Sequence, residues 1–123
     1  MASIFVMSGA NKGDYYPLGR RTNVIGRDEG LLVQVLDPMV SRKHMRIRYN
    51  KENNHYLADD LDSKHGTFIN GRRIIDETIL REGDQIGIGK THILFTTRDF
   101  SDNDSALNHF KKAGERIRDT LVE

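Results

Sequence analysis

The sequence predicts an all-β sandwich for most of the chain, and three observations support that prediction. Short runs of apolar, β-branched and aromatic residues recur along the first 98 residues, with Gly, Asp, Asn or Pro between them. A helical period is hard to find before residue 100. The 123 residues, 37% hydrophobic and 30% charged, are enough for one soluble domain with a moderate core.

The predicted strands share a high content of residues that favour extended backbone, and turn-forming residues separate them. In chain order, nine runs are 4–7, 15–18, 23–25, 31–36, 44–49, 55–58, 67–69, 85–88 and 93–97, and 72–75 and 78–80 add two shorter ones. Strands this short and this closely spaced are typical of a sandwich or barrel.

The run 44–49 alternates most clearly between apolar and polar residues. We expect the odd-numbered residues, Met45, Ile47 and Tyr49, to face the core and the even-numbered ones, His44 included, to face the other way. Residues 41–43 then lie on the loop that leads into this strand. Gly66 and Gly71 bracket another short strand, which puts residues 63–65 on the loop before it.

The last part of the chain has a different pattern. Cap-forming residues at 101–105 precede apolar residues at helical spacing, namely Leu107, Phe110, Ala113 or Gly114, Ile117 and Leu121. We predict a sandwich domain over residues 1–98, a linker over 99–104 and a C-terminal amphipathic helix over 105–123. Two interpretations of the helix remain open, because its apolar stripe suits packing on the sandwich as well as docking to a partner or forming a homodimer.

Composition excludes several classes of protein. The formal net charge is +1, too balanced for a protein that acts mainly by attraction to nucleic acid. There are no cysteines, which excludes disulfides and thiol nucleophiles and fits a cytoplasmic protein. The N-terminus lacks the features of a signal peptide, and no apolar run is long enough to cross a membrane. We therefore expect neither a nucleic-acid nor a membrane partner.

The sequence contains no motif with the spacing that catalysis, metal binding or cofactor binding requires. The segment 83–91 resembles a P-loop, but five residues stand where that motif has four, and a strand rather than a helix follows. The five histidines lack metal-site spacing, and we expect Asp60 and Asp62 to make turn hydrogen bonds instead. The prediction is a non-enzyme with no catalytic residue, no metal and no cofactor.

Three short segments together carry the functional signal. They are Gly26-Arg27, Ser41-Arg42-Lys43-His44 and Ser63-Lys64-His65-Gly66-Thr67-Phe68-Ile69-Asn70-Gly71. In this order they resemble the forkhead-associated (FHA) domain family, and the resemblance extends from about Ile4 to Thr97. It implies a sandwich of about eleven strands that binds phosphothreonine peptides through loops at one end.

The resemblance also assigns roles to individual residues. Arg27, Ser41, Arg42, Lys64, His65 and Asn70 are expected to contact the phosphopeptide, while Gly26, His44, Gly66 and Thr67 are expected to shape or brace the site. Physical chemistry supports the first two contacts. An arginine fork can meet two phosphate oxygens at once, and a serine hydroxyl is a short donor suited to a third.

The sequence departs from the family pattern at one position. His65 stands where the family usually has the asparagine of Ser-x-Asn-Gly-Thr, which bonds the main chain of the peptide. A neutral histidine also offers one donor and one acceptor, but on a larger ring. We expect phosphate binding to be retained, in an adaptor whose partner is modified by a Ser/Thr kinase. The alternative is a phosphate-independent interaction or assembly module that uses the sandwich surface or the C-terminal helix.

Overall fold

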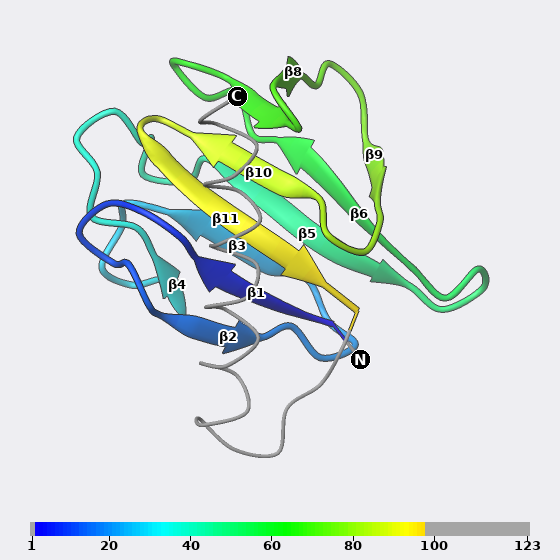
Figure 1. The fold of residues 1–123 in the computed structure, drawn as a ribbon. Helices are drawn as coiled ribbons and strands as arrows, with labels where there is room; N and C mark the ends of the chain where they lie inside the picture. Colours follow the sequence, from blue (N-terminus) through cyan, green and yellow to red (C-terminus); the bar gives the residue numbers. More distant parts are fainter. Residues whose placement is uncertain (1, 98–123) are drawn as a thin grey trace, which may run out of the picture.

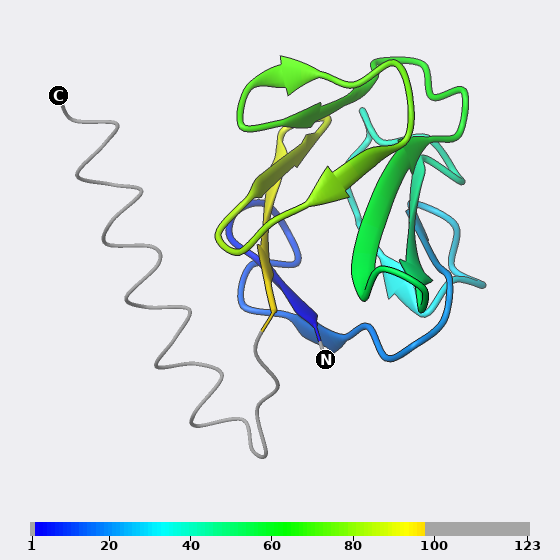
Figure 2. The same ribbon diagram turned by 90° about the vertical axis from the view of Figure 1, so that its right-hand side faces the viewer.

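The computed structural model describes residues 2–97, which form two β-sheets packed face to face (Figures 1 and 2). The eleven strands, in chain order, are β1 (Ser3–Val6), β2 (Tyr15–Pro17), β3 (Asn23–Gly26), β4 (Val33–Gln34), β5 (Met45–Asn50), β6 (His55–Asp60), β7 (Thr67–Ile69), β8 (Arg72–Arg73), β9 (Thr78–Leu80), β10 (Gln85–Ile88) and β11 (Thr91–Thr96). The all-β prediction is confirmed. The predicted linker 99–104 and helix 105–123 lie outside the described residues.

Each sheet is assembled mainly from antiparallel neighbours. Sheet A has the order β2-β1-β11-β10-β7-β8, and sheet B has the order β4-β3-β5-β6-β9. The pair β3 and β4 is parallel. No helix among the described residues is long and apolar enough to span a membrane.

The core lies between the sheets, where alternate residues of each strand point inward. Ile4 on β1 pairs with Phe95 on β11, and both are fully buried, as are Met45 and Ile47 on β5. Tyr49 packs against this core while remaining partly exposed. The predicted inward face of the run 44–49 is therefore confirmed.

His44 does not follow the predicted alternation. We expected it on the outward face of the strand, but it lies just before β5 and is completely buried. Its backbone N–H still donates to Ile25 O, and its carbonyl accepts from Leu61 N, so the residue is held between neighbouring segments. The polar ring can be buried at little cost because both of its nitrogens have hydrogen-bond partners, which are described below.

The predicted strand over residues 31–36 is much shorter in the structure. Only Val33 and Gln34 pair with β3, in parallel. Leu32 and Leu36 are 78% and 54% exposed, so the apolar run does not mark a buried strand throughout. Leu36 N donates instead to the side chain of Asn11, which ties this loop to the β1–β2 loop.

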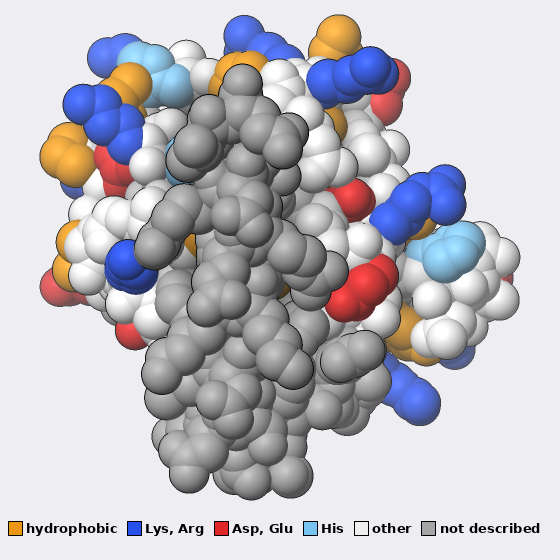
Figure 3. Space-filling model, in the orientation of Figure 1, with side chains coloured by type: hydrophobic (Ala, Val, Ile, Leu, Met, Phe, Trp, Pro, Cys, Tyr) orange, Lys and Arg blue, Asp and Glu red, His pale blue; other side chains and the backbone are white. Residues whose placement is uncertain are grey.

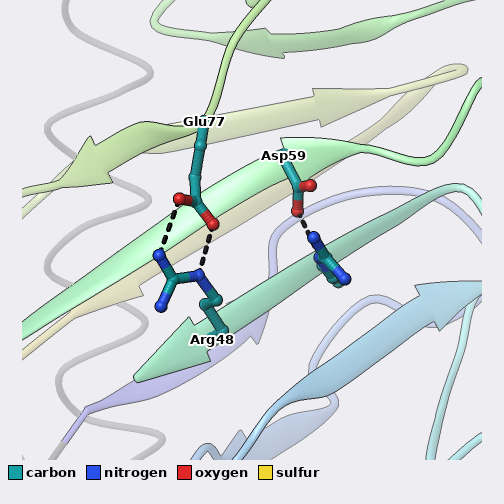
Figure 4. Close-up of polar contacts among 4 residues, drawn as sticks. Arg48, Asp59 and Glu77 are labelled. Carbon is teal, nitrogen blue, oxygen red and sulfur yellow. Dashed lines mark hydrogen bonds and ion pairs between the residues drawn. The ribbon is translucent and has the colours of Figure 1, made fainter. Parts of the chain in front are cut away.

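The outer faces of the two sheets differ in chemistry. On sheet A, Phe5 and Leu94 pair across β1 and β11 and form a small apolar cluster with Met7 and Tyr15, separate from the core. The Phe5 and Tyr15 rings stack with centroids 5.1 Å apart. Sheet B instead carries ion pairs on its outer face (Figure 4).

The ion pairs of sheet B bridge neighbouring strands. Arg46 Nε donates to Asp59 Oδ1 at 2.8 Å across β5 and β6, where the two residues are direct cross-strand partners. Arg48 makes a two-pronged contact with Glu77, which precedes β9, and one of its bonds, Nη2 to Oε1, measures 2.7 Å. Opposite charges placed this way stabilise strand pairing modestly.

Candidate functional site

The loops that follow β3, precede β5 and precede β7 gather at one end of the sandwich, on the left of Figure 1. Hydrogen bonds join them directly. Arg27 N donates to Ser41 O at 3.0 Å, and Asp28 N donates to Arg42 O at 3.2 Å. Lys64 N donates to Ser41 Oγ, also at 3.0 Å. The three segments singled out in the sequence therefore form one connected structure.

Arg27 is exposed, yet one edge of its guanidinium is held in place. Its Nε donates to Val40 O at 3.0 Å, on the loop before β5. Within residues 2–97 the two terminal nitrogens have no hydrogen-bond partner. A fork that is fixed at Nε and open at its terminal nitrogens is well prepared to bind an anion, because less side-chain freedom is lost when the anion arrives.

The Ser41 hydroxyl is oriented by its neighbour. Its oxygen accepts the backbone N–H of Lys64, so the hydroxyl hydrogen points elsewhere. No acceptor for that hydrogen is found among the described residues. The hydroxyl is consequently a donor that is available to a ligand. The residue before it, Val40, accepts the hydrogen bond that holds Arg27.

His44 braces two of the loops from below. Its Nδ1 accepts the Ser41 backbone N–H at 3.0 Å, and its Nε2 lies 2.8 Å from Gly66 O. Because Nδ1 is an acceptor, the ring hydrogen belongs on Nε2, where it is donated to the carbonyl. The buried ring thus links the loop before β5 to the loop before β7. It contacts the backbone of Ser41 rather than its hydroxyl, so the two residues are not arranged as a nucleophile and its base.

Two glycines allow the loops to approach closely. A Cβ atom on Gly26 would lie 2.1 Å from Arg42 O, well inside any real contact. Only glycine therefore permits the backbone of β3 to meet the loop before β5 at this point. Gly66 adopts φ +87°, a conformation that favours glycine.

Asp60 organises the loop between β6 and β7. It accepts from the backbone and hydroxyl of Ser63, at 2.9 and 2.5 Å, and from the Thr67 hydroxyl at 2.7 Å. Burial works to raise the pKa of Asp60, but these hydrogen bonds outweigh it and hold the pKa below the ordinary value. The predicted turn hydrogen bonds of Asp60 are confirmed, and Thr67 is seen to act on the same loop.

Sequence reasoning missed the role of Asp37. This buried carboxylate accepts from Met39 N, Lys90 N and the Thr91 hydroxyl, at 2.9, 2.8 and 2.9 Å. Burial acts to raise the pKa of Asp37, but the hydrogen bonds from the three donors stabilise the carboxylate more strongly. The pKa of Asp37 therefore lies below its ordinary value. Asp37 therefore fastens the loop before β5 to the turn between β10 and β11. The Asp-Pro pair at 37–38 was the available signal, but it does not show which donors would surround the carboxylate.

The remaining predicted contacts are distributed unevenly. Arg42, Lys64 and His65 are exposed at the loop end, and Lys, Arg and His side chains gather at the upper left of Figure 3. Asn70 lies at the other end of β7, where its amide binds Asp84 Oδ1 and the backbone N–H of Gln85. This position gives no support to the predicted contact between Asn70 and a peptide.

The exposed polar and charged groups of the loop end are suited to binding an anion. Within residues 2–97 no group of three or more His, Cys, Asp or Glu side chains could hold a metal ion. A groove beside Arg27 and Arg42 has a mixed lining of charged, polar and apolar residues, namely Asp28, Glu29, Gln34, Leu36, Asp37 and Pro38. The exposed cations and the oriented hydroxyl of Ser41 are the groups available to an anionic ligand.

Comparison with known proteins agrees with this arrangement. The model of the FHA domain family matches residues 23–89, more than half of the chain. The glycogen accumulation regulator GarA of Mycobacterium tuberculosis is 33% identical over 96 residues, which cover 78% of this chain and 57% of GarA. The chain therefore spans little more than half the length of this relative.

Solved structures share the same fold. One, from a structural and functional analysis of phosphothreonine-dependent FHA domain interactions, superimposes with a TM-score of 0.70 at 28% identity, over 80% of this chain and 98% of the other. Mycobacterium tuberculosis EmbR, in complex with a low affinity phosphopeptide, gives a TM-score of 0.71 at 25% identity, over 82% of this chain and 25% of EmbR.

Proposed function

The chain belongs to the FHA domain family, and from that premise we propose that it is a non-catalytic adaptor that binds phosphothreonine peptides of a partner modified by a Ser/Thr kinase. The observation that carries the proposal is the joined loop end, where the Arg27 fork is anchored by Val40 and the Ser41 hydroxyl is oriented by Lys64. The solved relatives with phosphothreonine-dependent interactions or a bound phosphopeptide support it.

The chemistry of a phosphothreonine matches these groups. Its phosphate carries a charge of roughly −1.5 to −2 at neutral pH and three acceptor oxygens. Arg27 can donate two parallel hydrogen bonds, Ser41 can donate a third, and Arg42 and Lys64 add positive charge. At about 1.5–3 kcal/mol for each charge-assisted bond, three bonds contribute up to about 9 kcal/mol, which is close to the roughly 8 kcal/mol of micromolar affinity.

His65 would replace the asparagine that usually contacts the peptide main chain in this family. Its exposed position at the loop end, next to Lys64, suits that contact. The proposal therefore includes a changed fit to the peptide backbone at this point. Replacing His65 by asparagine is expected to keep or strengthen affinity for phosphothreonine peptides.

Fluorescence anisotropy with a degenerate phosphothreonine peptide library and its unphosphorylated counterpart tests the proposal. We expect binding to the phosphorylated library only, and a loss of roughly 10- to 100-fold for Arg27→Ala. The matched control is Arg81→Ala, which removes the same charge from the exposed loop before β10, far from Ser41, and should leave affinity unchanged. Equal binding of both libraries, or an unaltered Arg27→Ala variant, would overturn the proposal.

A phosphate-independent assembly module is the second candidate. The exposed side chains of Leu32, Leu36 and Ile75 favour it, because they offer apolar contacts that need no phosphate on the partner. Such a module would retain its partner after phosphatase treatment and in the Arg27→Ala variant. We propose a cytoplasmic location for either role.

A further inference from the structure

Arg73 places an unexpected cation beside the loop end. Arg73 lies on β8 and pairs with Phe68 of β7. Phe68 is two residues after Gly66, which immediately precedes β7. A Cβ atom on Gly66 would lie 2.8 Å from Arg73 Nε and 3.1 Å from its Cζ. The Arg73 side chain therefore does not lie directly beside Phe68, its cross-strand partner. It extends back along β7 and rests its guanidinium against the Gly66 backbone.

Gly66 is constrained by its φ of +87°, which favours glycine. A methyl group at this position would require the Arg73 guanidinium to move. Gly66 O is also the acceptor for the His44 ring. The guanidinium of Arg73 consequently sits on a part of the loop before β7 that His44 holds in place, one residue from His65.

The charge of Arg73 is available to a ligand. The residue is exposed, and within residues 2–97 its guanidinium has no hydrogen-bond or ion-pair partner. The arginines on the outer face of sheet B differ, since Arg46 and Arg48 are each paired with a carboxylate. A positioned, unpaired guanidinium beside a binding loop is suited to receive a carboxylate from outside the chain.

Its neighbour Arg72 provides a contrast. Arg72 is also exposed, but it is opposite Ile69, whose side chain points toward the core. Because successive side chains on a strand point to opposite faces, Arg72 and Arg73 lie on different sides of sheet A. Arg73 is the one for which a close approach to Gly66, the residue after His65, is observed.

We propose that Arg73 is a specificity-determining residue that binds an acidic side chain, aspartate or glutamate, close to the phosphothreonine of the partner peptide. This inference rests on the proposed function of the loop end. A peptide crossing the loop before β7 passes His65 and then meets the guanidinium lying on Gly66. The contact lies on the β8 side of the site, separate from the cations Arg27 and Arg42.

The simpler account is that Arg73 only packs on the Gly66 peptide and contributes to stability. The two accounts differ in one measurable respect. Packing alone changes the free energy of unfolding and affects all peptides equally, whereas recognition changes the preference between acidic and neutral peptides. The decisive quantity is therefore a ratio of affinities within each variant.

The experiment uses the full chain and a phosphothreonine peptide in which aspartate, or alanine, is placed in turn at each position from three before to four after the phosphothreonine. Fluorescence anisotropy gives the ratio of dissociation constants at each position. We expect one or two positions where aspartate improves binding about fivefold in the wild type, the effect of one exposed charge pair. Arg73→Ala should abolish this preference, Arg73→Lys should keep part of it, and Arg72→Ala should keep all of it.

The outcomes separate this inference from the function on which it rests. If the wild type binds phosphothreonine peptides but Arg73→Ala retains the same acidic preference, or no position shows one, the role of Arg73 is overturned and the adaptor function stands. If the wild type binds no phosphorylated peptide, the proposed function is overturned, and the inference with it. Thermal unfolding of each variant confirms that the compared proteins are folded.

Discussion

The outer faces of sheets A and B differ in chemistry: sheet B carries exposed ion pairs and sheet A carries buried apolar side chains. On sheet B, Arg46 pairs with Asp59 and Arg48 pairs with Glu77 in the open, with the Arg48 and Glu77 side chains 36% and 31% exposed. On sheet A, the corresponding outward positions of β1 and β11 hold Phe5 and Leu94, only 1% and 4% exposed. One face resembles an ordinary solvent-facing sheet, and the other resembles the inside of a protein.

This difference shows that the sandwich core is not the only apolar packing in the molecule. Sheet A is apolar on both sides around β1 and β11, as is expected for a sheet covered on both faces. The outer face of sheet B is mixed, because the ion pairs lie on the same side as the partly exposed Leu57 and Ile79. The stability of sheet A should therefore depend on its outer face far more than the stability of sheet B does.

The largest effect is expected from Phe5→Ala. Phe5 stacks on Tyr15 and is almost fully buried, so its truncation should lower the free energy of unfolding by about 3 kcal/mol. Ile79→Ala is the matched control on the outer face of sheet B, where the side chain is 38% exposed and the loss should stay below about 1 kcal/mol. Urea unfolding measures both losses. Equal losses would show that the stability of sheet A does not depend on its outer face more than that of sheet B does.

A smaller effect is expected from removing residues 99–123. The apolar stripe predicted in this segment is a candidate cover for the Phe5 and Leu94 cluster, because the segment begins three residues after the end of β11, the strand that carries Leu94. We expect a chain of residues 1–98 to unfold with a free energy lower by about 2 kcal/mol, because some apolar surface returns to water.

Size-exclusion chromatography of the same truncated chain distinguishes the two interpretations of the helix. A monomer that is less stable than the full chain supports packing on the sandwich. A truncated chain of unchanged stability but altered oligomeric state supports docking to a partner or to a second copy instead.

The smallest effect is expected from the ion pairs of sheet B, and it depends on pH. The hydrogen bonds from Arg48 hold the pKa of Glu77 below its ordinary value of 4.5. A carboxyl whose pKa is lower in the folded state contributes stability above the unfolded pKa and loses it as the pH falls through the folded value.

Glu77→Gln should therefore reduce stability at pH 7, and the difference should become smaller at about pH 2.5, as protonation removes the Glu77 charge. The loss should be several times smaller than that of Phe5→Ala, roughly as for other exposed pairs. Urea unfolding of wild type and variant at both pH values measures it. A difference that stays the same in acid would mean that Glu77 acts through packing rather than through its charge.

Much of the fold could be predicted from the sequence because the strands are short, apolar and separated by clear turn residues. Each of the eleven predicted runs overlaps one of the eleven strands. The boundaries at 31–36 could not be predicted, since Leu32 and Leu36 have the residue type of a buried strand and the exposure of a loop. What limits β4 is its short pairing with β3, a tertiary feature that no local pattern records.

The candidate site could be predicted in part. Gly26, Arg27, Ser41 and His44 were all found by their motifs, and the structure joins them by hydrogen bonds or close contact. The burial of His44 contradicted the alternating pattern because its ring has two backbone partners, Ser41 three residues before it and Gly66 on another loop. Arg73 and Asp37 escaped sequence reasoning because their significance depends on what lies across from them in space.

The brace formed by His44 has a consequence for how such a domain can diversify. The groups that hold the loops together are largely backbone atoms and buried side chains, while the exposed groups around them take little part in that support. Arg42, Lys64, His65 and Arg73 can therefore be exchanged one at a time without moving the scaffold beneath them. Partner choice can drift by single surface substitutions while the chain continues to fold.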